Sequence, residues 1–371
     1  MSAIALAKAD RTNSRMNPTA TVSIKHTMEK LPELGKIHPE FFDQVIFPRL
    51  GAKDKNVIIC PRHGVDYGVV KIGDTCLSFS TDPFFIVPAY GFSRAAWFAF
   101  HIICSDVAVS GLKPKYLTVD LNLPPEITET QLTEMLEAVH REAEKYNISI
   151  ITGHTARYAG CNYPMVGGAT AIAQGTEAEL RGPHRVKIGD QIIITKGPAI
   201  ETTGLLGISF PEKFKTAFGA DFQKKAEDVF FQMSVMDDCA IARGFPGVHV
   251  MHDATECGIW GGLYEMARAG RYGIRVEQDL IVKQEVIIKT CAHFQIDPFS
   301  TISEGTLIAM VDPKEAGQLV SEFTKNNMLS SVVGEVTGKK DGLKITEGGR
   351  IFDLEHHKTD PYWAIMEKLL K

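Results

Sequence analysis

The sequence lacks a hydrophobic run long enough to cross a membrane. Its longest apolar stretch, Ala95–Cys104, contains His101 and is ended by Ser105 and Asp106, whereas a membrane helix needs about 20 apolar residues. Residues 1–30 are polar, carry scattered Lys and Arg, and lack the apolar core of a secretion signal. We therefore expect no membrane partner, a flexible tail over residues 1–30, and a cytoplasmic location.

Long basic runs and closely spaced cysteines are also absent. Forty Lys and Arg stand against forty-five Asp and Glu, a net charge of −5, so nothing favours a nucleic-acid partner. A zinc cluster needs close Cys or His pairs, and none of the seven cysteines forms a CxxC. Their odd number and wide spacing indicate reduced, mostly structural thiols. These are Cys60, Cys76, Cys104, Cys161, Cys239, Cys257 and Cys291.

What remains is the composition of an ordinary globular protein. The chain has 371 residues, of which 44% are hydrophobic and 23% charged, and both fractions are near the averages for soluble proteins. At about 150 residues per domain, this length predicts about two domains.

The first half of the chain alternates between strand and helix patterns. Apolar residues at helical spacing predict an amphipathic helix over 129–147, preceded by the capping box of Thr128 and Gln131. The apolar segment Ser93–Val109 predicts a helix buried on a sheet. We also predict a helix over 31–50 and strands, bounded by Gly, Pro or Asp, at Val57–Cys60, Cys76–Ser80, Tyr116–Leu123, Ile148–Ile151 (ended by a turn at Gly153, His154 and Thr155) and Met165–Ala173.

The second half repeats the alternation after a polar boundary over 175–187, which contains Gly182 and Pro183. The predicted domains are 31–176 and 185–345, followed by a C-terminal extension over 346–371. Both are mixed, so the fold class is α/β (α+β). The predicted strands are Gln191–Thr195, Val248–Met251, Ile274–Val276, Thr306–Val311 and Ser331–Val336, and the predicted helices are 224–243, Gly262–Ala269, 283–293 and 314–326.

Acidic residues recur beside small residues at the ends of predicted strands. They are Asp66 in GVDYG, Asp82 in FSTDP, Asp106 in CSDVAVSG and Asp253 in MHDATECG. Ligands collect at strand ends in α/β folds, and Mg²⁺ takes one or two protein carboxylates together with phosphate oxygens. Taken singly, such an Asp is more often a turn or cap residue, and the sequence contains neither a Walker A motif nor a GxGxxG.

Five segments occur in a characteristic order: LSFSTDPFFIVP, FHIICSDVAVSGLKPKYLTVDLNLP, ITGHT, MHDATECGIWGGLYEMA and SEGTL. In this order they resemble the AIR synthase-related superfamily, over about residues 33–340, and are most similar to its hydrogenase-maturation branch, HypE. The resemblance implies a two-domain PurM-like fold. It also implies that the N-terminal sheets of two chains pair into a homodimer, with ATP bound near that interface.

The resemblance assigns ligand-binding roles to five residues. Asp66, Asp82 and Asp106 fall on family acids that bind Mg²⁺ and the ATP phosphates. Gly153 and Thr155 fall on the family's GGDT-type turn and are expected to bind the nucleotide.

Three further residues fall on family positions to which we assign catalysis. Asp253 matches the Asp of the RDPT-type motif, Glu304 matches the Glu of the EG pair, and His154 takes the place of the acid in the GGDT-type turn. His101 matches a histidine often found in the family just before the Asp of its ND motif, on which Asp106 falls, but its apolar helix favours a packing role.

The chain departs from the family pattern at several of these motifs. Val65 and His154 stand where the family has acids, and Ser105 where it has Asn, so the number or position of bound metal ions is expected to differ. His154 would then contact a phosphate oxygen in place of Mg²⁺. Glu256 and Cys257 replace the Arg of the RDPTRGG motif.

Two cysteine positions of relatives are also unmatched. The sequence ends at Lys371 without the C-terminal cysteine of HypE, and no cysteine precedes Cys60 where selenophosphate synthetase has its reactive one. We therefore expect neither of these two activities to be retained.

Three functions stay open, of which we favour the first. It is an ATP- and Mg²⁺-dependent enzyme that activates an amide- or carbonyl-type oxygen of a small molecule or peptide group by phosphoryl transfer. The alternatives are a small-molecule kinase resembling thiamine-monophosphate kinase and a non-catalytic nucleotide-binding scaffold. The segment 196–204 is either a substrate loop or a Gly–Pro turn, and Cys257 is either a thiol activated at a helix start or a small packed residue.

Overall fold

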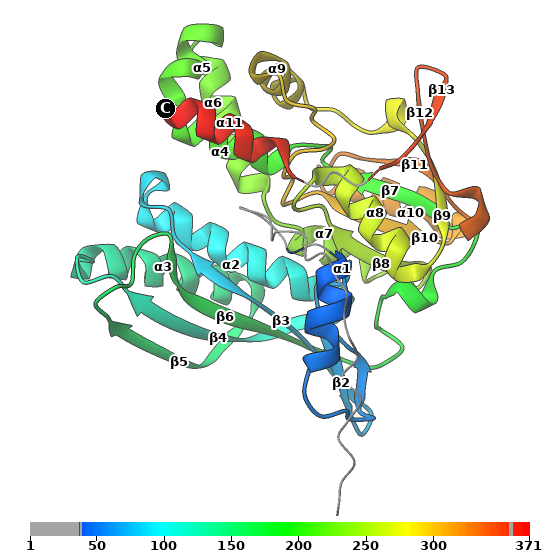
Figure 1. Ribbon diagram of the computed structural model, residues 1–371, viewed down its shortest axis with the longest axis horizontal. Helices are drawn as coiled ribbons and strands as arrows, with labels where there is room; N and C mark the ends of the chain where they lie inside the picture. Colours follow the sequence, from blue (N-terminus) through cyan, green and yellow to red (C-terminus); the bar gives the residue numbers. More distant parts are fainter. Residues whose placement is uncertain (1–36, 38, 356–358) are drawn as a thin grey trace, which may run out of the picture.

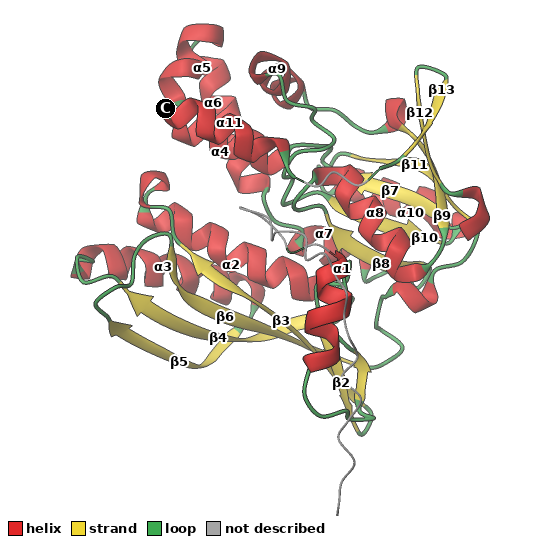
Figure 2. Ribbon diagram, viewed as in Figure 1, coloured by secondary structure: helices red, strands yellow, loops and turns green. Residues whose placement is uncertain are grey.

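Two mixed β-sheets, each covered by helices, form the body of the molecule (Figures 1 and 2). The computed structural model describes residues 37, 39–355 and 359–371, so the tail expected over 1–30 lies outside the described residues. Within the described part of the chain, no helix is long and apolar enough to span a membrane. The expected α/β class with two sheets is confirmed.

The first sheet has six strands in the order β1-β2-β3-β6-β4-β5. Neighbours are antiparallel except for the parallel pair of β4 and β5. Figure 1 shows helices α2 and α3 together on one face of this sheet. The elements are β1 Val57–Ile59, β2 Gly68–Ile72, β3 Thr75–Phe85, α2 Phe92–Ala108, β4 Lys113–Leu123, α3 Glu129–Tyr146, β5 Ser149–Arg157 and β6 Met165–Gly175.

The second sheet has seven strands in the order β13-β12-β9-β11-β7-β10-β8. Strands β8 and β10 are buried along their whole length, because helices cover this part of the sheet. The elements are β7 Gln191–Thr195, α7 Met236–Ala242, β8 Val248–Asp253, α8 Gly258–Gly270, β9 Gly273–Glu277, β10 Leu307–Val311, α10 Pro313–Lys325, β11 Ser330–Thr337, β12 Leu343–Glu347 and β13 Arg350–Asp353.

A group of helices stands apart from both sheets, at the top of Figure 1. Its core, in which Phe214, Phe230 and Leu206 are fully or almost fully buried, also includes Phe98 of α2. Its members are α4 Ile200–Ser209, α5 Pro211–Phe218, α6 Ala220–Asp228, the 3₁₀ turn η5 Val229–Gln232, α9 Glu285–Phe294 and α11 Pro361–Leu370.

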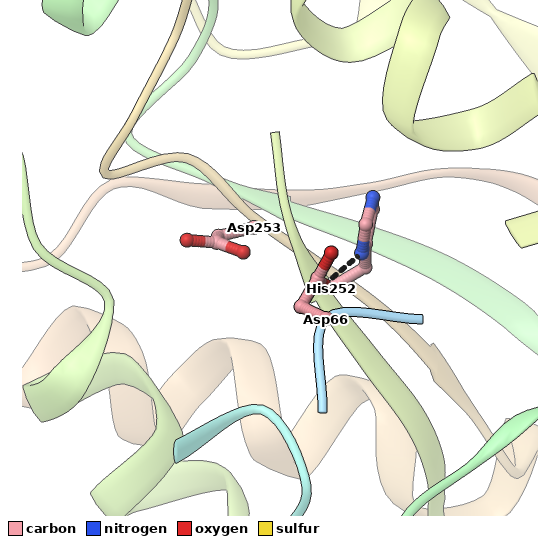
Figure 3. A group of neighbouring side chains, drawn as sticks. All are labelled: Asp66, His252 and Asp253. Carbon is pink, nitrogen blue, oxygen red and sulfur yellow. Dashed lines mark hydrogen bonds and ion pairs between the residues drawn. The ribbon is translucent and has the colours of Figure 1, made fainter. Parts of the chain in front are cut away.

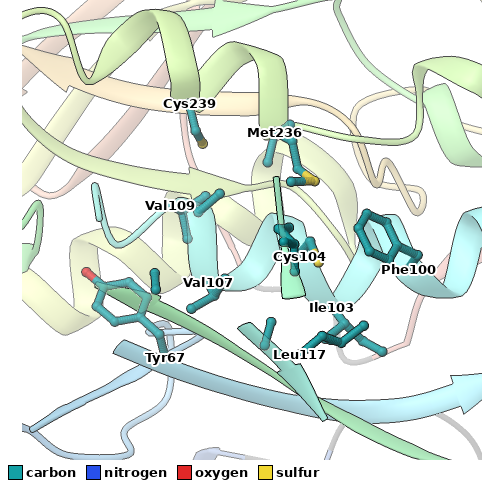
Figure 4. Packing of buried hydrophobic residues seen from close by; sticks show 14 of the residues in the cluster. Tyr67, Phe100, Ile103, Cys104, Val107, Val109, Leu117, Met236 and Cys239 are labelled. Carbon is teal, nitrogen blue, oxygen red and sulfur yellow. The ribbon is translucent and has the colours of Figure 1, made fainter. Parts of the chain in front are cut away.

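One continuous hydrophobic core joins the two sheets. Ile103 of α2 and Leu117 of β4 belong to the same buried cluster as Met236 and Cys239 of α7, and Figure 4 shows α2 lying between strand β4 and helix α7. Of the 17 residues of α2, 12 are buried. Its apolar-all-round sequence therefore reflects contact with both halves of the molecule.

Most predicted elements are confirmed, but the helix predicted over 224–243 is wrong. The segment breaks into α6, η5 and α7, with residues 233–235 outside any helix. Ser234 lies in this break, where its hydroxyl contacts Nδ1 of His101 at 2.7 Å and its carbonyl accepts a hydrogen bond from Lys196 Nζ at 2.8 Å. Contacts with distant residues thus override a local pattern that favours a longer helix.

The turn predicted at Gly153, His154 and Thr155 is also wrong, because β5 continues through all three residues to Arg157. Predicted helix 31–50 is described only from Pro39, as the short α1 Pro39–Phe41, the π-helical turn η1 Phe42–Ile46 and the 3₁₀ turn η2 Phe47–Arg49. The sequence patterns missed β2, β12, β13, α4, α5 and α11.

Candidate active site

A buried histidine links a carboxylate of one half of the chain to the other half. Asp66 lies in the loop between β1 and β2, and its Oδ2 is 2.6 Å from Nδ1 of His252 on β8. The other ring nitrogen, Nε2, lies 3.5 Å from Oε2 of Glu265 on α8. Burial lowers the pKa of His252, but Asp66 and Glu265 outweigh it and raise that pKa to about 10. His252 is therefore a cation near pH 7 that fixes the orientation of the Asp66 carboxylate.

The next residue of β8, Asp253, points to the opposite side of the strand (Figure 3). Its side chain is fully buried, and neither of its carboxylate oxygens accepts a hydrogen bond from a described residue. Burial, and then the charge of Asp66, raises the pKa of Asp253 to about 6. A buried carboxylate without donors is costly unless a cation or a proton compensates it.

Glu304 completes this side of the site. Its Oε1 is buried and accepts no hydrogen bond from a described residue, while burial and the neighbouring Asp253 raise its pKa well above the ordinary value. The backbone N–H of Glu304 donates to Oε2 of Glu201 on α4 at 3.2 Å. Burial raises the pKa of Glu201 to about 8. Glu304 and Glu201 therefore both favour the protonated state in the absence of a metal ion.

The remaining acids come from the first sheet and its helix. Asp106 of α2 is buried, and its Oδ2 lies 3.0 Å from the hydroxyl of Ser80 on β3, which also lies 2.9 Å from the backbone carbonyl of Asp66. Burial raises the pKa of Asp106 well above its ordinary value, with further contributions from Asp253 and Asp82. The structure thus brings Asp66, Asp82, Asp106, Asp253 and Glu304 into one electrostatic group.

This acidic group fits a divalent cation by the chemistry of its donors. Ligand atoms of Asp66, His252 and Asp253 lie within 4.8 Å of one another. Because both nitrogens of His252 already contact carboxylates, the carboxylate oxygens are the available ligands. A set of oxygen donors is what Mg²⁺ prefers, and both carboxylate oxygens of Asp253 and Oε1 of Glu304 lack any other partner among the described residues.

Residues 153–155 lie on strand β5, away from the acidic group. Asp82 pairs with Ala169, Ala169 with Val119, and Val119 with Gly153. Three strand spacings therefore separate β3 from β5, about 14 Å. His154 is exposed, and its Nε2 lies 2.8 Å from the hydroxyl of Tyr158. A role for Gly153, His154 and Thr155 at the acidic group stays a prediction, and it would need the β5 strand of a second copy.

Several other residues singled out in the sequence have structural partners. His101 is 1% exposed and lies between Ser234 and Glu142, as expected for a packing residue. Cys257 is 4% exposed and precedes α8 with a φ of 61°, and its N–H donates to Asp360 at 2.6 Å. Burial of this kind fits a packed residue. Lys196 forms a buried ion pair with Asp238 at 2.6 Å.

Sequence reasoning missed three residues that shape the site: His252, Glu265 and Glu201. His252 directly precedes Asp253, and strand alternation places its side chain on the opposite face, but nothing local reveals the partner Asp66, 186 residues away. Glu201 lies in the segment 196–204, where the structure places the start of α4 in addition to a turn.

Comparisons with known proteins define the class. Residues 64–174 match the model described as AIR synthase related protein, N-terminal domain, and residues 187–345 match that of its C-terminal domain. These two matches cover most of the chain, which therefore belongs to the AIR synthase related family.

Individual relatives extend over most of the chain. A putative hydrogenase expression/formation protein of Methanocaldococcus jannaschii is 23% identical over 326 residues, 86% of this chain and 94% of its own length. The carbamoyl dehydratase HypE of Escherichia coli is 26% identical over 310 residues, 79% and 86% of the two chains. A HypE structure in complex with ATP is similar with a TM-score of 0.61 at 18% identity, covering 87% of this chain and 93% of that one. The chain is an enzyme of this family.

Proposed function

We propose that the chain is an ATP- and Mg²⁺-dependent enzyme that phosphorylates an amide- or carbonyl-type oxygen and then releases or exchanges the phosphate, as a dehydratase-type enzyme does. The observation that carries this proposal is the acidic group, in which carboxylates from both halves of the chain meet and in which both carboxylate oxygens of Asp253 and Oε1 of Glu304 lack donors among the described residues. A bound cation would compensate these carboxylates in their ionised state, and Mg²⁺ can be held by the carboxylates and by the ATP phosphates at the same time. The relatives, which include the carbamoyl dehydratase HypE and a HypE structure in complex with ATP, support it.

Different residues of the acidic group would bind the metal ion and transfer the proton in this reaction. Asp82, Asp106 and Asp66 would hold Mg²⁺, with Asp66 oriented by His252. When bound, Mg²⁺ compensates the charge of the transferring phosphoryl group. The acceptor oxygen attacks the γ-phosphorus while the bond to ADP breaks. Glu304 and Asp253, whose pKa values are raised by burial, are placed to exchange a proton with the acceptor.

Calorimetric titration with ATP, with and without Mg²⁺, tests this function. We expect the unmodified protein to bind ATP in a Mg²⁺-dependent manner and Asp82→Ala/Asp106→Ala to bind at least about 100-fold more weakly, about 2.7 kcal/mol. Asp74→Ala is the matched control, because Asp74 is exposed in the turn between β2 and β3. Unchanged binding by the double variant would place the nucleotide elsewhere. Phosphate released by substrate-dependent turnover separates the dehydratase-type reaction from a kinase, whose product retains the phosphate, and from a scaffold without turnover.

We also propose a homodimer that pairs the first sheets, because β5 is an edge strand with exposed apolar side chains. Ile150 and Ile151 are 48% and 54% exposed, and an unpaired apolar edge favours association. We expect the protein to elute with twice the chain mass in light scattering, and Ile151→Asp to shift it to the monomer. Ile188→Asp, at an exposed apolar residue before β7, should leave the mass unchanged. A monomeric unmodified protein would exclude this arrangement.

A further inference from the structure

A cavity between the two halves of the chain is lined by three arginines and one lysine against one carboxylate, that of Asp43, whereas the proposed active site is acidic. Its volume is about 490 Å³, within the range of small-molecule sites. The first half supplies Phe47 of η2 and Arg62 of the loop after β1. The second half supplies Arg268 and Arg271 at the end of α8, and Lys339 of the 3₁₀ turn η7 Lys339–Asp341. None of the acids of the proposed active site lines it.

The cations of this cavity are only partly neutralised. Arg268 pairs with Asp43 at 3.0 Å and with Glu40 at 3.5 Å. By contrast, Arg62, Arg271 and Lys339 have no carboxylate within 4.0 Å among the described residues. This concentration of positive charge occurs in a chain whose net charge is −5. The positive charges that line the cavity repel one another, and a bound anion reduces that repulsion.

The side chains that line the cavity indicate which class of anion it would bind. The planar guanidinium groups of Arg62 and Arg271 suit the paired oxygens of a phosphate, and Lys339 adds a point charge. Phe47, whose side chain is 45% exposed, offers a flat apolar surface on which a ring can stack. A carboxylate ligand would satisfy fewer of these donors than a phosphate or diphosphate group does.

We propose that this cavity binds a phosphate-bearing small molecule at a site separate from the acidic group. The ligand class is a phosphate or diphosphate ester whose organic part contacts Phe47. Since the cavity is bounded by both halves of the chain, its occupant bridges η2, the loop after β1, α8 and η7. The proposal does not depend on the proposed enzymatic function, because its residues and its charge are distinct.

Titration with inorganic pyrophosphate in EDTA at low ionic strength tests this site. Without divalent metal the acidic group repels the anion, so binding reports the basic cavity alone. We expect saturable one-to-one binding that weakens as salt is raised. Arg62→Gln/Arg271→Gln should weaken it at least about tenfold, and Lys339→Gln to a smaller degree.

Lys340→Gln is the matched control, because Lys340 is exposed in the same turn but does not line the cavity. It should bind pyrophosphate as the unmodified protein does. Equal thermal midpoints for all variants would show that folding is intact. Absence of binding by the unmodified protein, or equal binding by Arg62→Gln/Arg271→Gln, overturns the proposal. Mg²⁺-dependent ATP binding, measured separately, reports the proposed function and is expected to persist in the cavity variants.

Discussion

Asp253→Asn is expected to stabilise the metal-free protein while removing its response to Mg²⁺ and ATP. In the unmodified protein the Asp253 carboxylate is fully buried and receives no hydrogen bond from a described residue. The rise of its pKa from 3.8 to about 6 corresponds to about 3 kcal/mol of unfavourable free energy near neutral pH. Asparagine removes that charge and can donate its amide N–H to the neighbouring Glu304 carboxylate.

Differential scanning calorimetry with and without Mg²⁺ and ATP measures both effects. We expect a higher midpoint for metal-free Asp253→Asn than for the unmodified protein, and a much smaller increase when Mg²⁺ and ATP are added. Turnover should fall by at least about 100-fold. Asp74→Asn, at an exposed turn, should behave as the unmodified protein. A lower midpoint for Asp253→Asn, or an undiminished response to Mg²⁺ and ATP, would contradict the assignment of Asp253 to the site.

Lys196→Met is expected to cause the largest loss of stability among single substitutions near the site, about 3–5 kcal/mol. Lys196 Nζ lies 2.6 Å from Oδ2 of Asp238, which is 1% exposed, and it also donates to the carbonyl of Ser234. The substitution would leave the Asp238 charge buried with only the hydroxyl of Thr195, at 2.5 Å, as a partner among the described residues. It would also remove the hydrogen bond that holds Ser234 in the non-helical segment between η5 and α7.

The free energy of unfolding in urea, measured for a small set of variants, separates the effect of the buried charge from the effect of lost packing. Lys196→Met/Asp238→Asn should recover a substantial part of the loss, because the uncompensated charge is gone. Lys344→Met is the control, since its ion pair with Asp353 is exposed and surface pairs contribute little. If Lys196→Met were as stable as the unmodified protein, the buried pair would not contribute to the fold, and a direct role for Lys196 at the substrate would regain support.

The sequence predicted those elements whose signals are local. The capping box of Thr128 and Gln131 begins α3 as expected, and the buried run Gln191–Thr195 is strand β7 with the predicted bounds. The helix predicted over 224–243 failed because Ser234 exchanges helical hydrogen bonding for contacts with His101 and Lys196. Those partners lie more than 35 residues away, beyond the reach of any local periodicity.

The same distinction applies to the site. Asp66, Asp82, Asp106, Asp253 and Glu304 could be named from motif order, and the structure brings them together. The contact between Asp66 and His252 depends on how the two halves pack, so it could not be predicted. Strand β5 also shows a limit of pattern reading, since a Gly–His–Thr sequence that is typical of a turn continues an exposed strand.

The hydrophobic core shared by the two sheets has a consequence for how the enzyme admits its ligands. Because Ile103, Met236 and Leu307 belong to one buried cluster, rotating the halves apart would expose apolar side chains from both sheets to water. The link from Asp66 to His252 would break in the same motion. Opening of the active site by a hinge between the halves is therefore disfavoured. Access is instead expected from local movements of loops.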